Sequence, residues 1–78
     1  MTVEIITPDK NIYNGEASFV SVPGIDGSLG ILNNHAPLIT TLIEGEILLR
    51  KEDGTEEKIA VGGGVLEVLK NKVIILAE

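Results

Sequence analysis

Apolar residues along this chain alternate with polar ones in short runs, and turn-forming residues separate the runs. An apolar period of two residues indicates β-strands, because successive side chains of a strand point to opposite faces of a sheet. The pattern predicts strands at residues 2–7, 12–13, 17–22, 46–51, 57–61, 65–69 and 73–77. No window longer than about ten residues keeps the period of a helix. The chain is therefore predicted to be all-β, with roughly six to ten short strands in a sandwich or barrel.

Turn signals divide these runs. Clusters of Pro, Asp, Asn and Gly predict turns at residues 8–11, 14–15, 23–27 and 70–72. Asp53-Gly54 is the strongest signal for a two-residue hairpin turn.

The segment 29–42 organises the chain, because it is apolar at both ends and interrupted once by a polar corner at residues 33–37. Pro37 has a fixed φ and favours extended backbone at Ala36. Asn33 and Asn34 tolerate turn and left-handed conformations. We expect the aliphatic residues on both sides to fix this corner to the core, which makes it a candidate contact loop.

Three strands depart from strict alternation and are apolar on both faces: residues 38–39, 65–69 and 73–76. An antiparallel sheet with one solvated face should alternate apolar and polar residues. Some of these side chains are expected to cover loops at the ends of the sandwich. The others predict an exposed apolar patch, which usually marks a surface for a partner.

Length and charge narrow the possible functions. The 78 residues form one small domain, residues 1–78, without cysteine and with one histidine, so disulfides and thiolate metal sites are excluded. A net charge of −6 and only two aromatic residues argue against nucleic-acid binding and against adsorption on anionic lipid. Neither a signal peptide nor a membrane-spanning segment is visible, so a cytoplasmic location is the default expectation.

No constellation of residues supports catalysis, and neither a metal nor a cofactor is expected. Gly62-Gly63-Gly64 lacks the Lys-Ser/Thr of a phosphate loop, and backbone crowding at a bulge or strand crossing explains it better. Asp26-Gly27-Ser28 lacks the spacing of a calcium loop. His35 has no evident acid and nucleophile for general-base work, so a structural or interface role is favoured.

Several motifs in order resemble one family, the N-terminal β-sandwich domain of the epsilon subunit of F-type ATP synthases, called delta in mitochondria. The motifs are Thr7-Pro8, Tyr13-Asn14-Gly15, Val20 to Gly24, Gly27 with Leu29-Gly30-Ile31, His35-Ala36-Pro37-Leu38, Leu42 with Gly45, Gly63-Gly64 with Leu66-Glu67-Val68, and Val73 to Glu78.

The resemblance implies a small, flattened antiparallel β-sandwich of about ten short strands that has no catalytic residues. It implies a central-stalk subunit that binds the gamma subunit and the c-ring, acts only indirectly on the alpha and beta subunits, and couples proton-driven rotation to ATP synthesis. The gamma-facing residues would be Thr7, His35, Ala36, Pro37, Leu38, Ile39 and Thr40. The residues facing the c-ring would be Ile25, Asp26, Gly27 and Ser28.

The implied location is peripheral, on the cytoplasmic side of the bacterial inner membrane or the stromal face of the thylakoid. The family usually continues into a C-terminal helical hairpin, which is absent from these 78 residues. The sequence also departs from the family at Ser28, where an acid is frequent, at Asn33, where a proline is frequent, and at Gly62, where a serine is common.

Two other functions stay open at this point. A biotinyl or lipoyl carrier domain is also a β-sandwich of about this size and carries a modified lysine at a hairpin tip. Lys70 and Lys72 flank such a tip, but the usual neighbours of a modified lysine are missing. A free-standing hydrolase using His35 is the other alternative.

Overall fold

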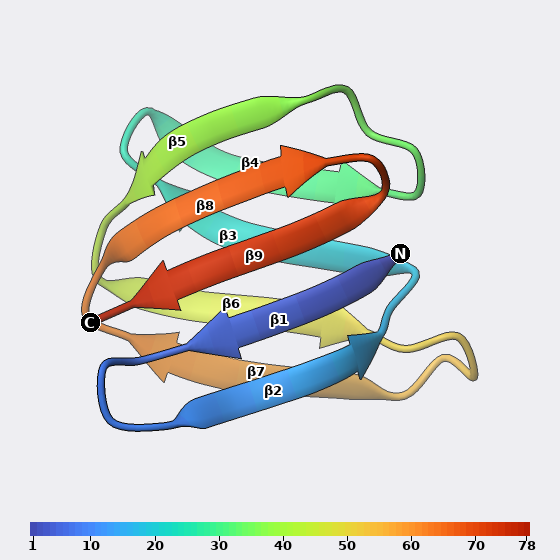
Figure 1. Ribbon diagram of the computed structural model, residues 1–78, viewed down its shortest axis with the longest axis horizontal. Coiled ribbons are helices and arrows are strands. Elements are labelled where there is room, and N and C mark those ends of the chain that lie inside the picture. Colours follow the sequence, from blue (N-terminus) through green and yellow to red (C-terminus); the bar gives the residue numbers. More distant parts are fainter.

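The computed structural model describes all 78 residues, and its regular structure consists of strands only (Figure 1). The nine strands are β1 (Thr2–Ile6), β2 (Asn11–Glu16), β3 (Phe19–Gly24), β4 (Gly27–Leu32), β5 (Leu38–Leu42), β6 (Gly45–Arg50), β7 (Glu56–Val61), β8 (Gly64–Leu69) and β9 (Lys72–Ala77). The structure contains no helix with the length and hydrophobicity needed to cross a membrane. The prediction of an all-β chain with about ten short strands is confirmed.

The strands form one curled sheet in the order β2-β1-β9-β8-β5-β3-β6-β7, and β4 pairs with the other edge of β3. Figure 1 shows two layers, with β2, β1, β9, β8 and β5 in front of β4, β3, β6 and β7. The layers are joined where Gly24 of β3 pairs with Leu42 of β5. All pairings are antiparallel except that of β1 with β9, which is parallel, with Val3 opposite Val73.

Burial alternates along every central strand, as the apolar period requires. The side chains between the layers include Val3, Ile5, Val20, Val22, Ile31, Ile47, Leu49, Leu66, Val68, Val73 and Ile75, all at most 2% exposed. Burial of these aliphatic side chains is the main favourable term for a chain without disulfides.

One turn prediction is wrong, and another is right in position but wrong in turn type. Asn14-Gly15 does not form a turn but continues β2, where the pair Val3 and Gly15 lies in register. A side chain at Gly15 would approach the Tyr13 hydroxyl to 3.2 Å, so the glycine leaves room for the Tyr13 ring. Asp53-Gly54 lies in a longer loop, closed by a 2.8 Å hydrogen bond from the Lys51 amide to the Thr55 carbonyl.

The two-residue turn of the type predicted for Asp53-Gly54 occurs instead at Lys70-Asn71, between β8 and β9. Both residues have positive φ, 51° and 59°, as a type I′ turn requires. Leu69 and Lys72 are paired directly behind it. Asn at the second position tolerates this conformation, and pairing of the flanking apolar strands holds Lys70 in it.

The triple glycine lies where backbones cross closely, as predicted. Gly63 and Gly64 have φ of 129° and 144°, and a Cβ on Gly64 would collide with the Leu76 carbonyl oxygen. The Gly62 amide donates to the Glu78 carbonyl at 3.2 Å, and the Glu78 amide donates to the Gly63 carbonyl at 3.0 Å. These glycines therefore fasten the end of β9 to the start of β8.

Candidate functional site

The front layer presents an exposed apolar surface on its outer side, formed by β5, β8 and β9. We call it the outer apolar face; it consists of Ile39, Val65, Leu69, Ile74 and Leu76. Ile39 is 71% exposed, Leu76 54%, Leu69 49% and Val65 41%. Apolar side chains gathered on adjacent strands, unlike scattered ones, indicate a surface that another protein covers. The predicted apolar patch is thus present.

Two carboxylates interrupt the outer apolar face. Glu67 of β8 lies in register between Ile39 of β5 and Ile74 of β9. Glu4 of β1 lies on the other side of Ile74. Neither carboxylate forms a salt bridge within the chain. A partner that covers this face must therefore supply hydrogen-bond donors opposite Glu67 and Glu4, because a buried carboxylate without a partner is costly.

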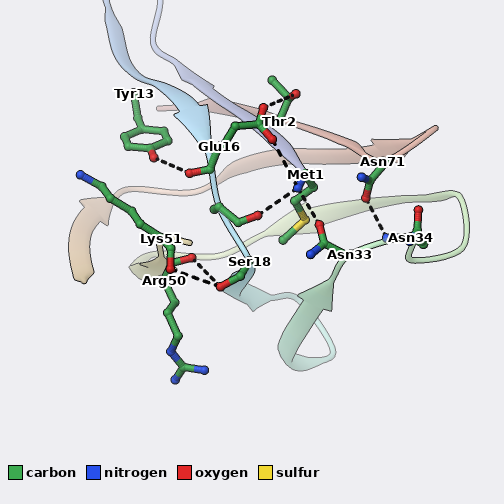
Figure 2. A network of polar contacts seen from close by, with 11 residues as sticks. Met1, Thr2, Tyr13, Glu16, Ser18, Asn33, Asn34, Arg50, Lys51 and Asn71 are labelled. Atoms are coloured by element: carbon green, nitrogen blue, oxygen red, sulfur yellow. Dashed lines mark hydrogen bonds and ion pairs between the residues drawn. The ribbon is translucent and has the colours of Figure 1, made fainter. Parts of the chain in front are cut away.

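The polar corner at residues 33–37 connects β4 to β5 at one end of the outer apolar face. Asn34 adopts a left-handed φ of 63°, as predicted for this position. Its amide donates to the Asn71 side-chain oxygen at 2.7 Å, which ties the corner to the β8–β9 turn (Figure 2). A shallow hollow separates the two segments and is lined by residues including His35, Pro37 and Leu69.

A second set of bonds holds the corner to the start of β1 (Figure 2). The Met1 amino group donates to the Asn33 side-chain oxygen at 2.6 Å and to the Ala17 carbonyl at 3.0 Å. The Glu16 carboxylate lies 3.6 Å from the same nitrogen. The Met1 side chain is buried, so β1, β2 and the corner meet at a fixed point.

His35 is half-buried in the corner, and its ring nitrogen Nδ1 lies 2.8 Å from the carbonyl oxygen of the adjacent Ala36. Neither a carboxylate nor a hydroxyl is hydrogen-bonded to the imidazole. No group of three or more His, Asp or Glu side chains is placed to hold a metal ion. The local geometry thus lacks the orienting acid that a histidine base requires.

The residues predicted to face the c-ring form a tight turn at the other end of β4. Ile25 and Asp26 connect the paired Gly24 and Gly27, and Ile25 is 57% exposed. The Ile25 amide donates to the Thr41 carbonyl at 3.0 Å, so the turn is fixed to β5. The exposed Ile25 side chain therefore lies on a turn whose backbone is fixed to β5.

The structure does not bring all predicted gamma-facing residues together. Residues 35–40 are contiguous, with Ile39 on the outer apolar face and Leu38 and Thr40 half-buried on the other side of β5. Thr7 follows β1 at the opposite end of the front layer, because Ile6 aligns with Leu76 and not with the β8–β9 turn. The Thr7 hydroxyl is hydrogen-bonded to the backbone of Lys10, which closes a turn.

Sequence reasoning named Ile39 as a site residue but omitted its neighbours Val65, Leu69, Ile74 and Leu76. The signal in the sequence was that strands 65–69 and 73–76 carry apolar residues on both faces, not on one face only. Only the register of β5, β8 and β9 shows that these side chains form one surface.

Two ionisable groups with shifted pKa values lie away from these surfaces, in the β6–β7 loop. The hydrogen bond and charge of Glu57, 3.1 Å away, raise the pKa of Lys51. The Thr55 amide, 2.9 Å from the Asp53 carboxylate, lowers the pKa of Asp53. Both groups stabilise a loop and neither faces a candidate site.

The chain matches a known protein family over its whole length. Residues 1–78 match the family model described as ATP synthase, Delta/Epsilon chain, beta-sandwich domain. The chain is 45% identical to the ATP synthase epsilon chain of Brevibacillus brevis and 47% identical to that of Moorella thermoacetica, over all 78 residues. It spans 59% and 58% of the length of these two relatives.

Solved structures share the fold. One is a chain in the Euglena gracilis mitochondrial ATP synthase, with a TM-score of 0.90, 21% identity, and coverage of 96% of this chain and 48% of that one. Another comes from the central stalk and c-ring structure of Tetrahymena thermophila mitochondrial ATP synthase. Its TM-score is 0.83 at 23% identity, with 99% of this chain and 62% of that chain covered.

Proposed function

Because the chain belongs to the ATP synthase delta/epsilon chain β-sandwich family, we propose that it is a non-catalytic domain of the central stalk. It binds the gamma subunit on one surface and the c-ring on another. In this position it couples proton-driven rotation of the ring to ATP synthesis at sites on other subunits. Contact with the c-ring implies a peripheral location at the membrane surface, without insertion into the membrane.

The observation that carries the proposal is the outer apolar face beside the fixed corner. Ile39 is the most exposed of its large aliphatic residues and lies next to residues 35–38, which the family resemblance assigns to gamma. A cluster of this kind on a chain of net charge −6 favours burial against a neighbour over an independent existence in water.

Transmission of torque requires a body that does not deform. The corner is fixed to the β8–β9 turn and to the start of β1 by the Asn71 and Asn33 side chains. The turn at residues 25–28 is fixed to β5 through the Ile25 amide. Hence the two proposed contact surfaces are attached to the same paired strands, and a displacement of one carries the other with it.

The tip of the turn at residues 25–28, formed by Ile25 and Asp26, is the proposed contact with the c-ring. Ser28 stands where an acid is frequent in the family, so the contact here depends on the exposed Ile25 and on Asp26. A mainly apolar contact is less sensitive to salt than an ionic one.

Binding of a purified gamma subunit to two matched variants tests the gamma contact. Ile39→Asp places a carboxylate on the outer apolar face, whereas Ile43→Asp makes the same change at an exposed position after β5, 49% exposed. We expect Ile39→Asp to weaken binding by about tenfold or more, because a desolvated unpaired charge costs well over 1 kcal/mol. Ile43→Asp should change the affinity little.

Unfolding of both variants in urea separates binding from stability. Both side chains are exposed, so we expect both variants to keep most of the wild-type stability. Equal losses of gamma affinity in the two variants, or a loss matched by unfolding, would contradict the proposed surface.

A further inference from the structure

Three strands of the sheet have a neighbour on one side only: β2, β4 and β7. The free side of such an edge strand presents unpaired N–H and C=O groups, which can pair with a strand of another chain. Proteins usually protect these edges with charged side chains, prolines or bulges. The three edges of this sandwich differ in that protection.

β2 and β7 are protected. The pairing of β2 with β1 shifts register between Ile5 and Ile6, which is an irregularity of the bulge type. β7 begins with three charged residues, Glu56, Glu57 and Lys58. Two of these carboxylates form ion pairs, with Arg50 at 3.0 Å and with Lys51 at 3.1 Å.

β4 has none of these protective features. Its sequence, Gly-Ser-Leu-Gly-Ile-Leu, contains neither a charged residue nor a proline. Its register with β3 is continuous from Phe19 opposite Leu32 to Gly24 opposite Gly27. The side chain of Leu32 is 61% exposed at the end of this edge.

The hydrogen bonds of β3 fix which β4 groups are free. The Ile25 amide donates to Thr41 and the Pro23 carbonyl accepts from Ile43, so the odd-numbered residues here point toward β5. Bonding alternates from residue to residue along an antiparallel strand. Even-numbered residues of β3 therefore bond to β4, and their partners in β4 are Gly27, Leu29 and Ile31.

It follows that Ser28, Gly30 and Leu32 direct their N–H and C=O groups away from β3. All three residues are exposed, and β4 forms no other strand pairing. An extended segment that adds to a sheet edge forms main-chain hydrogen bonds with outward groups of this kind.

A hollow of about 220 Å³ lies beside this edge, between β4 and β5. Its lining includes Leu29 from β4, Leu38 and Thr40 from β5, and Asp26, Gly27 and Ser28 from the turn and the start of β4. An apolar cavity of about 150 Å³ already accommodates a benzene molecule, so the hollow has room for one apolar side chain.

We propose that the free edge of β4 receives an extended strand of the gamma subunit and that the hollow holds one of its side chains. This inference rests on the proposed function, since Leu38 and Thr40 belong to the predicted gamma surface. The net charge of −6 favours a neutral or basic strand. The same charge disfavours pairing of β4 with a second copy of this chain.

Amide hydrogen exchange, measured by NMR on the wild-type chain with and without purified gamma subunit, tests the proposal. In the free chain the amides of Ser28, Gly30 and Leu32 should exchange rapidly, because they have no acceptor. In the complex they should slow by about tenfold or more, as amides do when they join a ladder. The amide of Ala60, outward on β7 by the same alternation, should not change.

A matched pair of proline variants gives a second measurement. Ser28→Pro and Ala60→Pro each remove an outward N–H from an edge strand, a position where proline is tolerated. We expect Ser28→Pro to weaken gamma binding by about tenfold or more and Ala60→Pro by less than about threefold. If Ser28→Pro fails to fold, the exchange measurement on the wild-type chain still decides.

The outcomes separate this inference from the function on which it rests. If gamma binds and the three β4 amides stay unprotected, strand addition is refuted and the stalk function stands. Protection that depends on the concentration of the chain alone would identify a second copy as the occupant and refute the proposal. Failure of gamma to bind at all would refute both.

Discussion

Replacement of Leu66 by alanine, compared with the same replacement at Leu69, tests whether β8 faces the core as described. The two leucines lie on one strand, three residues apart, and differ in side: Leu66 is 0% exposed and Leu69 is 49% exposed. The removal of three buried carbons costs about 2.4 kcal/mol at roughly 0.8 kcal/mol each. The cavity left at Leu66 raises the expected loss to about 3–4 kcal/mol.

Leu69 is half in water already and can leave no closed cavity, so its loss should be about 1 kcal/mol. A chain of 78 residues has a total stability of about 4–12 kcal/mol, at roughly 0.05–0.15 kcal/mol per residue. Leu66→Ala should therefore lower the melting temperature by about 12–32 °C and Leu69→Ala by about 4–8 °C.

Urea unfolding followed by circular dichroism gives both values, and an unchanged m-value shows that the two states are comparable. Similar losses for the two variants, or a larger loss at Leu69, would refute the assignment of faces on β8. Leu69→Ala should in turn weaken gamma binding more than Leu66→Ala does, once both are compared at a temperature where they are folded.

Three further predictions concern the backbone and the loops. Gly64→Ala should destabilise the chain by about 2 kcal/mol or more and Gly27→Ala by about 1 kcal/mol. Both residues have positive φ, but only the Cβ added at position 64 would collide with a carbonyl oxygen. Equal shifts in the urea midpoint of the two variants would contradict this. Asn71→Ala should lower the free energy of unfolding by about 1–2 kcal/mol and accelerate hydrogen exchange of the Asn34 amide. An unchanged exchange rate would show that the 2.7 Å hydrogen bond does not hold the corner. The pKa of Asp53 is lowered in the folded chain, so its contribution is fully present above the unfolded pKa of about 3.9 and is lost as the pH falls through the lower folded pKa. The difference in urea stability between wild type and Asp53→Asn should accordingly shrink below about pH 4, and a constant difference would refute it.

Most of the fold was accessible from the hydrophobic pattern, because each central strand has one face that must be buried. The predicted strands at 46–51, 57–61, 65–69 and 73–77 correspond to β6–β9 within one or two residues. The polar corner also lies as predicted, since Pro37 and the two asparagines restrict the backbone locally. Local chemistry and burial agreed at these positions.

The errors occurred where pairing with a distant strand overrode a local preference. Asn14-Gly15 is a strong turn dipeptide, but β1 needs a partner along its free side, and β2 extends through it. Lys70 enters a left-handed conformation that its type disfavours, because β8 and β9 pair directly behind it. The parallel pairing of β1 with β9 joins the two ends of the chain, and no local pattern reports such a contact.

The candidate site was only partly predictable for the same reason. Residues 35–40 are contiguous in sequence, so a motif could indicate them together. The apolar side chains that complete the surface come from two other strands and become one face only through register. Thr7 is an example of the opposite case. It was predicted to face gamma together with His35, but it lies at the other end of the front layer.

Calorimetry of gamma binding over a range of temperatures and salt concentrations tests the central claim most directly, namely that the outer apolar face is buried against gamma. The account predicts a clearly negative heat-capacity change, since apolar surface leaves water, and an affinity that varies by less than about threefold between low and high salt. A heat-capacity change near zero, together with an affinity that falls steeply as salt is added, would contradict it.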